Sequence, residues 1–265
     1  MPSYRPLDGL RVLVTGASSG IGAAVSSLLA EHGARVVGTG RDAAALTGAS
    51  VAGGGPFEAT IVRDLLERSA PDAVVEAAAK ALEGLDVVIS NAGSGWLGPF
   101  EQMPPAELDA LLDLNLRAPL HLAHAAAPYL RKSDAGGQLV LVGSIAGLVG
   151  VAEEVAYSTT KAGLAGLADS LRAEWATDQV TVTLVSPGPV DTAFYLRRNQ
   201  PYTHSWPRPV PVGRAARAIV RAVETRREDV VIPGWLALAA RLHGGWPSLY
   251  RALGGAGRGL AGMRR

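Results

Sequence analysis

The sequence predicts an α/β protein with a doubly wound parallel sheet of about seven strands and helices on both faces. Short apolar runs alternate along the chain with longer Ala- and Leu-rich stretches of helical spacing. A strand that is apolar on both sides belongs in a sheet covered on both faces, because successive side chains point to opposite faces. The predicted strands are residues 10–14, 35–39, 57–62, 85–89, 138–143, 180–185 and 229–232.

Helical patterns fill the intervals between these runs. One follows residue 22, and others cover residues 69–82, 104–130, 155–176 and 213–225. Residues 48–56 contain four glycines and a proline and are expected to form a turn region. In residues 104–130 leucines fall on every side of the helix, so this helix needs two partners, one of which we expect to be another subunit.

Composition limits the classes of function. The chain has 265 residues, 48% of them hydrophobic and 18% charged, which is typical of one large folded domain. A net charge of +1 gives no overall attraction to nucleic acid, and without cysteine there is no disulfide or thiol chemistry. The five histidines show no ligand spacing, so no metal site is expected.

No signal peptide or membrane span is evident in the sequence. The N-terminal residues lack a basic region followed by an apolar run, and no apolar stretch approaches the roughly 20 residues that cross a bilayer. We therefore expect a cytoplasmic protein, with a single catalytic domain over residues 8–233 and a C-terminal helical extension over residues 234–265.

A glycine-rich segment follows the first predicted strand directly. It reads Thr15-Gly16-Ala17-Ser18-Ser19-Gly20-Ile21-Gly22 and leads into a helical pattern. Glycines let the backbone approach a pyrophosphate, and a helix N-terminus supplies free N–H groups and the positive end of a dipole. This context predicts dinucleotide binding in a Rossmann-type sheet, whereas the alternative is a tight turn without a ligand.

The second predicted strand ends at Gly40-Arg41-Asp42, where such a sheet faces the adenosine ribose. An acidic residue there would bind the 2′-hydroxyl of NAD(H), whereas an arginine favours the 2′-phosphate of NADP(H). We therefore predict that Arg41 selects NADP(H), with NAD(H) bound through Asp42 as the alternative. Asp64, at the tip of the third predicted strand, is expected at the adenine edge.

Tyr157 and Lys161 are the candidate acid–base pair. They lie four residues apart in a predicted helix, so they share one face. A cation beside a phenol favours the phenolate, so we expect Lys161 to lower the pKa of Tyr157 from about 10 and make it a general acid or base. The fifth predicted strand brings Ser144 to the same edge of the sheet. Asn115 interrupts an apolar helix, either as a satisfied polar group or as part of a proton path.

Two segments near the C-terminus are unusual. Residues 189–212 are rich in proline and aromatic residues and are predicted to form a lid over the substrate. Residues 234–265 carry tryptophans and arginines but no acidic residue. We expect a helix packed on the lid or on a second subunit, with a basic amphipathic helix on a membrane surface as the alternative.

These residues together resemble the single-domain short-chain dehydrogenase/reductase family over residues 8–233. The family motif T-G-x-x-x-G-x-G falls on residues 15–22, N-A-G on residues 91–93, Y-x-x-x-K on residues 157–161 and P-G on residues 187–188. The resemblance implies that Tyr157 is the acid/base, Ser144 binds the substrate oxygen, Lys161 binds the nicotinamide ribose and Asn115 holds a water in a proton relay.

The same family resemblance, together with the type and position of the side chains in the sequence, implies two sets of contacts, one to the cofactor and one to the substrate. The expected cofactor contacts are Gly16, Ser18, Ser19, Gly20, Ile21, Gly22, Arg41, Asp64, Leu65, Asn91, Ala92, Gly93, Tyr157, Lys161, Pro187, Gly188, Val190 and Thr192. The expected substrate contacts are Ser144, Trp96, Ile145, Val151, Phe194 and Tyr195, with Val149, Pro189 and Trp206 as further pocket residues.

We therefore expect an NADP(H)-dependent oxidoreductase that interconverts a ketone or aldehyde and an alcohol by hydride transfer, on a bulky apolar substrate. The alternatives are a non-catalytic NAD(P)-sensing binding protein and a membrane-surface lipid or steroid dehydrogenase. Family resemblance also implies a homodimer or homotetramer built on the helices at residues 104–130 and 155–176.

Overall fold

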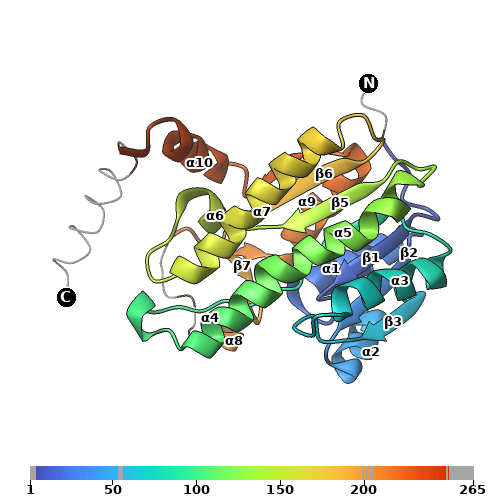
Figure 1. Cartoon of the computed structure of the whole chain (residues 1–265), viewed down its shortest axis with the longest axis horizontal. Coiled ribbons are helices and arrows are strands. Elements are labelled where there is room, and N and C mark those ends of the chain that lie inside the picture. The colour runs from blue at the N-terminus through green and yellow to red at the C-terminus, as the bar shows by residue number, and fades with distance from the viewer. Residues whose placement is uncertain are drawn as a thin grey trace.

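The computed structural model describes residues 4–52, 56–198, 200, 202, 206–248 and 250. In this part of the chain a seven-stranded parallel sheet has the order β3-β2-β1-β4-β5-β6-β9 (Figure 1), which confirms the predicted fold class. The strands are β1 (Arg11–Thr15), β2 (Arg35–Gly40), β3 (Ala59–Val62), β4 (Val87–Ser90), β5 (Gln138–Val142), β6 (Thr181–Pro187) and β9 (Asp229–Ile232).

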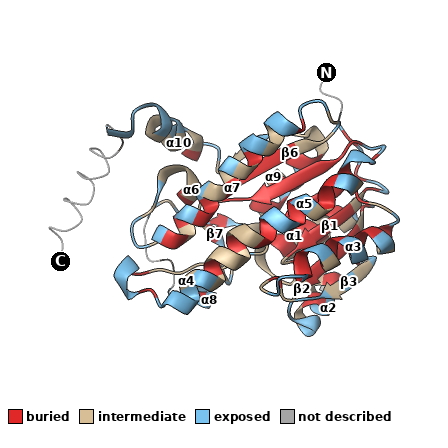
Figure 2. Ribbon diagram, in the orientation of Figure 1, coloured by how far each residue is buried: buried red, intermediate tan, exposed pale blue. Residues whose placement is uncertain are grey.

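Helices cover both faces of the sheet. Successive side chains of β1 point to opposite faces and are buried on both. Val12 and Val14 belong to the apolar cluster under α1 (Gly20–Glu31) and α9 (Val212–Thr225), whereas Leu13 belongs to the opposite cluster. That second cluster lies under α3 (Ala70–Leu82), α5 (Ala118–Arg131) and α7 (Val155–Glu174). Figure 2 shows the strands buried between these two helical layers.

The predicted turn region at residues 48–56 is wrong in its first half, because α2 (Ala43–Ala52) continues through it. The Asp42 carboxylate accepts a hydrogen bond from the Ala45 N–H at 3.0 Å and so caps the helix. Leu46 is fully buried and fixes the helix to the core. A single helical glycine, Gly48, is tolerated because tertiary packing outweighs its low propensity.

The long helix predicted at residues 104–130 is divided. It consists of α4 (Pro105–Leu112), a π-helical turn at Asp113–Arg117, and α5. Asn115 lies in this turn and is fully buried. Such π-turns occur frequently at functional sites, so a polar residue that is buried there marks a candidate.

Two pieces of chain after β6 lie at the carboxyl end of the sheet. The predicted lid contains β7 (Val190–Asp191), α8 (Phe194–Arg197) and β8 (Val210–Pro211), with β7 and β8 paired in parallel. The helix α10 (Leu236–Gly245) follows β9 and packs on α6 (Ile145–Val149) at the periphery (Figure 1). None of the helices that the structure describes is both long enough and apolar enough to cross a membrane.

Candidate active site

The glycine-rich segment joins β1 to α1 at the carboxyl edge of the sheet. A Cβ built on Gly22 would lie 2.2 Å from the Gly16 carbonyl oxygen, so only glycine lets the helix start this close to the loop. The N-cap, Ser19, makes no side-chain capping hydrogen bond. The N–H groups of the first turn are therefore not capped by Ser19, which fits the binding of a pyrophosphate at this helix end.

Asn91 and Thr15 fix the neighbouring strand ends. The Thr15 hydroxyl accepts hydrogen bonds from the backbone N–H groups of Asn91 and Ala92, both at 3.0 Å. The Asn91 side-chain amide donates to the Thr15 carbonyl at 2.9 Å. These bonds hold β1 against the chain that leaves β4, so the predicted N-A-G segment borders the glycine-rich loop.

The tip of β2 separates the two alternatives for the adenosine ribose. Arg41 is exposed, whereas the Asp42 carboxylate is engaged as the cap of α2. The hydroxyl of Ser18 lies 3.2 Å from the position that a Cβ on Gly40 would occupy. Arg41 and Ser18 therefore both lie next to Gly40 at the tip of β2, whereas the Asp42 carboxylate is used in the hydrogen bond that caps α2.

Asn115 makes hydrogen bonds to the segment after β4. Its Oδ1 accepts from the Ser94 N–H at 2.9 Å, and its Nδ2 donates to the Ser94 carbonyl at 2.9 Å. The position of a Cβ on Gly93 would lie 3.0 Å from Asn115 Oδ1 and 3.6 Å from Lys161 Nζ. The structure therefore brings Asn115 and Lys161 to either side of Gly93, with the Asn115 amide satisfied by the protein.

Ser144 follows β5 and is the N-cap of α6. Its Oγ accepts a hydrogen bond from the Ala146 N–H at 3.1 Å and donates to the Pro187 carbonyl at 3.5 Å. Because α6 packs on α7, Ser144 comes close to Tyr157, and its side chain acts to lower the pKa of the phenol. The predicted pair on α7 and the predicted serine are therefore in contact.

Burial decides the protonation of both groups of the pair. It raises the pKa of Tyr157 to about 12, against the smaller lowering effect of the Ser144 hydrogen bond, and it lowers the pKa of Lys161 to about 8. The Lys161 ammonium donates to the Val142 carbonyl at 2.9 Å and lies 5.8 Å from the centre of the Tyr157 ring. The prediction that Lys161 lowers the pKa of Tyr157 is therefore wrong in this structure, because desolvation dominates.

Aromatic side chains of the predicted lid cover Tyr157. The Phe194 ring centre lies 5.8 Å from that of Tyr157, and the Tyr195 ring centre lies 5.6 Å from that of Phe194. Trp96 packs with Tyr157 on a small apolar cluster that includes Met103. Three of the predicted substrate residues thus gather around the phenol.

The remaining predicted contacts lie around the same edge. The Thr192 side chain lies 3.5 Å from the Cβ position of Gly20, which places it against the glycine-rich loop. Leu65, Pro187 and Val190 are buried, whereas the other residues are half-buried: Ile21, Asp64, Ile145, Val149, Val151, Gly188 and Pro189.

The family of this chain follows from comparison with known proteins. A family model described as short chain dehydrogenase matches residues 11–202. The chain belongs to the short-chain dehydrogenase/reductase family. Family membership makes it a nicotinamide-dependent oxidoreductase, and the motifs that predicted the family lie on the loop, the strand ends and the helix described above.

Several proteins are similar to this dehydrogenase. An uncharacterized oxidoreductase of Staphylococcus aureus is 34% identical over 71% of this chain and 80% of its own length. The structure of a metagenomic short-chain oxidoreductase in complex with NADP is 36% identical, covers 85% of this chain and 97% of its own, and superposes with a TM-score of 0.70. A short-chain dehydrogenase from Sphingobium yanoikuyae in complex with NADPH is 27% identical, covers 96% of both chains and has a TM-score of 0.76.

Two consecutive arginines of this dehydrogenase attach the predicted lid to both walls of the site. Arg198 forms a buried ion pair with Glu154, the N-cap residue of α7, and lies over the Tyr195 ring at 4.7 Å. Arg197 donates a hydrogen bond to the Ser19 hydroxyl at 2.9 Å. Sequence reasoning missed both contacts. The available signal was an Arg-Arg pair in an aromatic loop and an acidic residue one turn before Tyr157.

Trp206 does not line this site, contrary to the sequence-based expectation. It is 68% exposed and stacks on Trp235 with ring centres 4.7 Å apart. The Trp206 ring therefore belongs to another surface, shared with Trp235.

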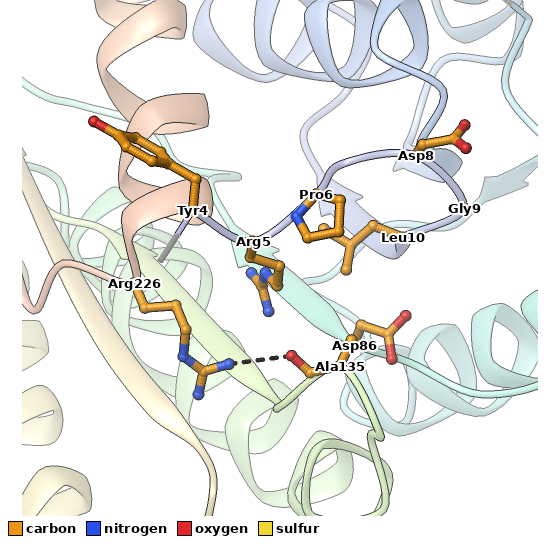
Figure 3. Close-up of a pocket in the computed structure, with 9 residues that line it drawn as sticks. All are labelled: Tyr4, Arg5, Pro6, Asp8, Gly9, Leu10, Asp86, Ala135 and Arg226. Atoms are coloured by element: carbon orange, nitrogen blue, oxygen red, sulfur yellow. Dashed lines mark hydrogen bonds between the residues drawn. The ribbon is translucent and has the colours of Figure 1, made fainter. Parts of the chain in front are cut away.

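A separate cavity of about 390 Å³ opens at the amino ends of the strands (Figure 3). Arg5 points into the body of the dehydrogenase there and donates to the Gly136 carbonyl at 2.8 Å, and Arg226 donates to the same carbonyl at 2.7 Å. None of the predicted site residues lines this cavity. The two guanidinium groups join the N-terminal segment and α9 to the loop before β5, which is a structural role.

Proposed function

We propose that this dehydrogenase transfers hydride between NADP(H) and a ketone or aldehyde and its alcohol, with Tyr157 as the general acid or base. The observation that carries the proposal is the contact between Ser144 and Tyr157 beside the buried Lys161, at the edge where the glycine-rich loop is open to a pyrophosphate. Similar structures that hold NADP and NADPH support this choice of cofactor. We assign catalysis to residues 8–233 and substrate coverage to residues 189–212.

Each residue of the proposed site has one task in the reductive direction. The nicotinamide, when bound, supplies the hydride that the carbonyl carbon accepts. Ser144 orients the carbonyl oxygen by a hydrogen bond, and Tyr157 donates its phenolic proton to that oxygen. Lys161 fixes the cofactor ribose and places positive charge behind the tyrosine. Asn115, whose side-chain amide is paired with Ser94, keeps the segment after β4 in place beside Lys161. In the oxidative direction Tyr157 accepts the proton instead.

Substrate class follows from the lining of the proposed pocket. Trp96, Phe194 and Tyr195 surround Tyr157 with aromatic surface. An apolar pocket with few polar groups favours a bulky apolar ketone or secondary alcohol.

Arg41→Ala is expected to weaken NADPH binding by about 10- to 100-fold, since a charge-assisted bond to the 2′-phosphate is lost. NADH binding, which lacks that phosphate, should change less than about twofold. Nicotinamide fluorescence titration measures both. Arg68→Ala, another exposed arginine on the loop before α3, is the matched control and should bind both cofactors as the wild type does. Tighter binding of NADH than of NADPH by the wild type would overturn the assignment.

The Arg198–Glu154 pair is expected to hold the lid closed over the substrate. Glu154→Gln leaves the buried Arg198 without a charged partner, which costs about 3–5 kcal/mol where a buried pair is broken. We expect KM for the carbonyl substrate to rise at least about tenfold while the Kd for NADPH stays within about twofold. The double variant Glu154→Gln/Arg198→Gln should recover part of the loss, because no unpaired charge remains. Additive losses in this double-mutant cycle would contradict the coupling.

Self-association through α4 and α5 is part of the proposal. Leu120 on α5 is 44% exposed although it belongs to a helix that is apolar on most sides. A second subunit that packs on this face would bury it. A monomeric mass in light scattering at micromolar concentration would contradict this part.

A further inference from the structure

Charge is distributed very unevenly along the chain despite the net charge of +1. Residues 192–223 and 230–265 contain eleven of the 22 arginines and none of the 24 acidic residues. The rest of the chain has an excess of acids. A strongly basic region in a nearly neutral protein indicates a surface selected for an anionic partner.

The described parts of these two segments meet in space. Trp206, from the lid segment, stacks on Trp235, which immediately precedes α10. Both rings line one surface cavity of about 380 Å³ together with Arg208 and Arg214. These two arginines are exposed and form no ion pair within the described residues. Basic and aromatic side chains from the lid, α9 and α10 therefore share one region.

The helix α10, which begins directly after Trp235, adds exposed apolar side chains. Leu236 is buried against the protein, whereas Leu238 is 74% exposed and Trp246, which follows the helix, is 68% exposed. Arg241 is exposed on the same helix. We call Trp206, Arg208, Arg214, Trp235, Leu238 and Trp246 the Trp–Arg surface. Exposed tryptophans beside unpaired arginines are typical of proteins that dock at a bilayer interface.

We propose that the Trp–Arg surface docks this dehydrogenase on an anionic phospholipid bilayer. Its arginines complement anionic headgroups, while the tryptophan and leucine side chains enter the interfacial region. A second copy of the chain is a poorer partner, because a two-fold contact through this surface would set arginines against arginines. Single-stranded nucleic acid would pair with arginine and tryptophan but gives no reason to expose leucine.

Docking at this surface has a consequence that rests on the proposed function. The segment that carries Trp206 and Arg208 also carries Phe194 and Tyr195, which cover Tyr157. A bilayer in contact with the Trp–Arg surface would therefore lie beside the lid. A bilayer there would hold an apolar, lipid-dissolved substrate next to the lid.

Co-sedimentation of the full-length protein with vesicles tests the proposal. We expect binding to vesicles of phosphatidylglycerol and phosphatidylcholine at low salt and little binding to pure phosphatidylcholine. The protein should be released in about 0.5 M salt, where screening of charges is strong. In addition, tryptophan emission should shift to the blue and be quenched by brominated lipid. Failure to bind anionic vesicles at low salt would overturn the proposal.

Two pairs of variants identify the surface. Arg208→Gln/Arg214→Gln should weaken vesicle binding on the order of tenfold or more, since each cation near the surface contributes to attraction. The matched control is Arg68→Gln/Lys80→Gln, which removes two exposed cations, one just before α3 and one on it. This variant should bind vesicles as the wild type does. Leu238→Ser/Trp246→Ser should weaken binding at constant charge, whereas Phe100→Ser, at a residue 50% exposed elsewhere, should not.

The same experiments also distinguish docking on a bilayer from three other kinds of binding, and from failure of the proposed oxidoreductase function. Equal loss in both cation pairs would indicate nonspecific charge attraction and overturn the proposal. Binding of a single-stranded oligonucleotide in preference to vesicles, or a doubling of mass that the leucine and tryptophan variants abolish, would replace lipid by nucleic acid or a second copy. NADPH affinity measured in solution without vesicles reports on the proposed function separately.

Discussion

Tyr157→Phe is expected to lower kcat/KM for carbonyl reduction by about 10²- to 10⁴-fold, the range for loss of a general acid. The substitution removes the proton donor while the ring, with its contacts to Phe194 and Trp96, stays in place. The Kd for NADPH should change less than about threefold. Steady-state kinetics together with fluorescence titration measure the two effects separately.

The pH dependence of the wild type follows from the same phenol. Because burial raises the pKa of Tyr157 to about 12, the phenol stays protonated through neutral pH. Carbonyl reduction should therefore be independent of this group up to about pH 11, one unit below the raised pKa, and fall above that. Alcohol oxidation needs the deprotonated form and should rise with pH. A retained reductase rate in Tyr157→Phe would show that Tyr157 is not the proton donor. Binding of NADPH by the wild type without reduction of any carbonyl would instead favour a non-catalytic cofactor-sensing protein.

Gly147→Ala is expected to lower activity by about 100-fold, although residue 147 touches neither cofactor nor substrate in the proposed mechanism. A Cβ on Gly147 would lie 2.4 Å from the Lys161 carbonyl carbon, so α6 must move away from α7. That movement separates Ser144, at the start of α6, from Tyr157 on α7. Overpacking of this kind also costs about 1–3 kcal/mol of stability. Single-turnover reduction and thermal unfolding measure the two consequences.

The matched control for this substitution is on α7 itself. A Cβ on Gly166 meets nothing within 4 Å, so Gly166→Ala should keep full activity and gain stability through its higher helix propensity. Full activity in Gly147→Ala would show that the contact between α6 and α7 does not set the position of Ser144.

Local sequence determined most of the sheet and the identity of the candidate site. Parallel strands buried on both faces must be apolar almost throughout, so runs such as residues 85–89 are recognisable without any structure. The glycines of residues 16–22 were recognisable from their spacing, and the structure shows the reason at Gly16 and Gly22, where a Cβ would collide with neighbouring backbone. Ser144, Tyr157 and Lys161 were found because spacing on a helix and position at a strand end are properties of sequence order.

Tertiary structure alone decided the electrostatics and the partners of those residues. The pKa of Tyr157 depends on how much water its neighbours exclude, and residues as distant in sequence as Trp96 and Phe194 pack against it. The spacing to Lys161 could not show that its ammonium turns to the Val142 carbonyl. Likewise, the stacking of Trp206 on Trp235 and the pairing of Arg198 with Glu154 join segments that no local pattern connects. The periodicity of apolar residues in the sequence shows which side of a helix or strand is buried. Only the packing of the folded chain determines which residues cover that side.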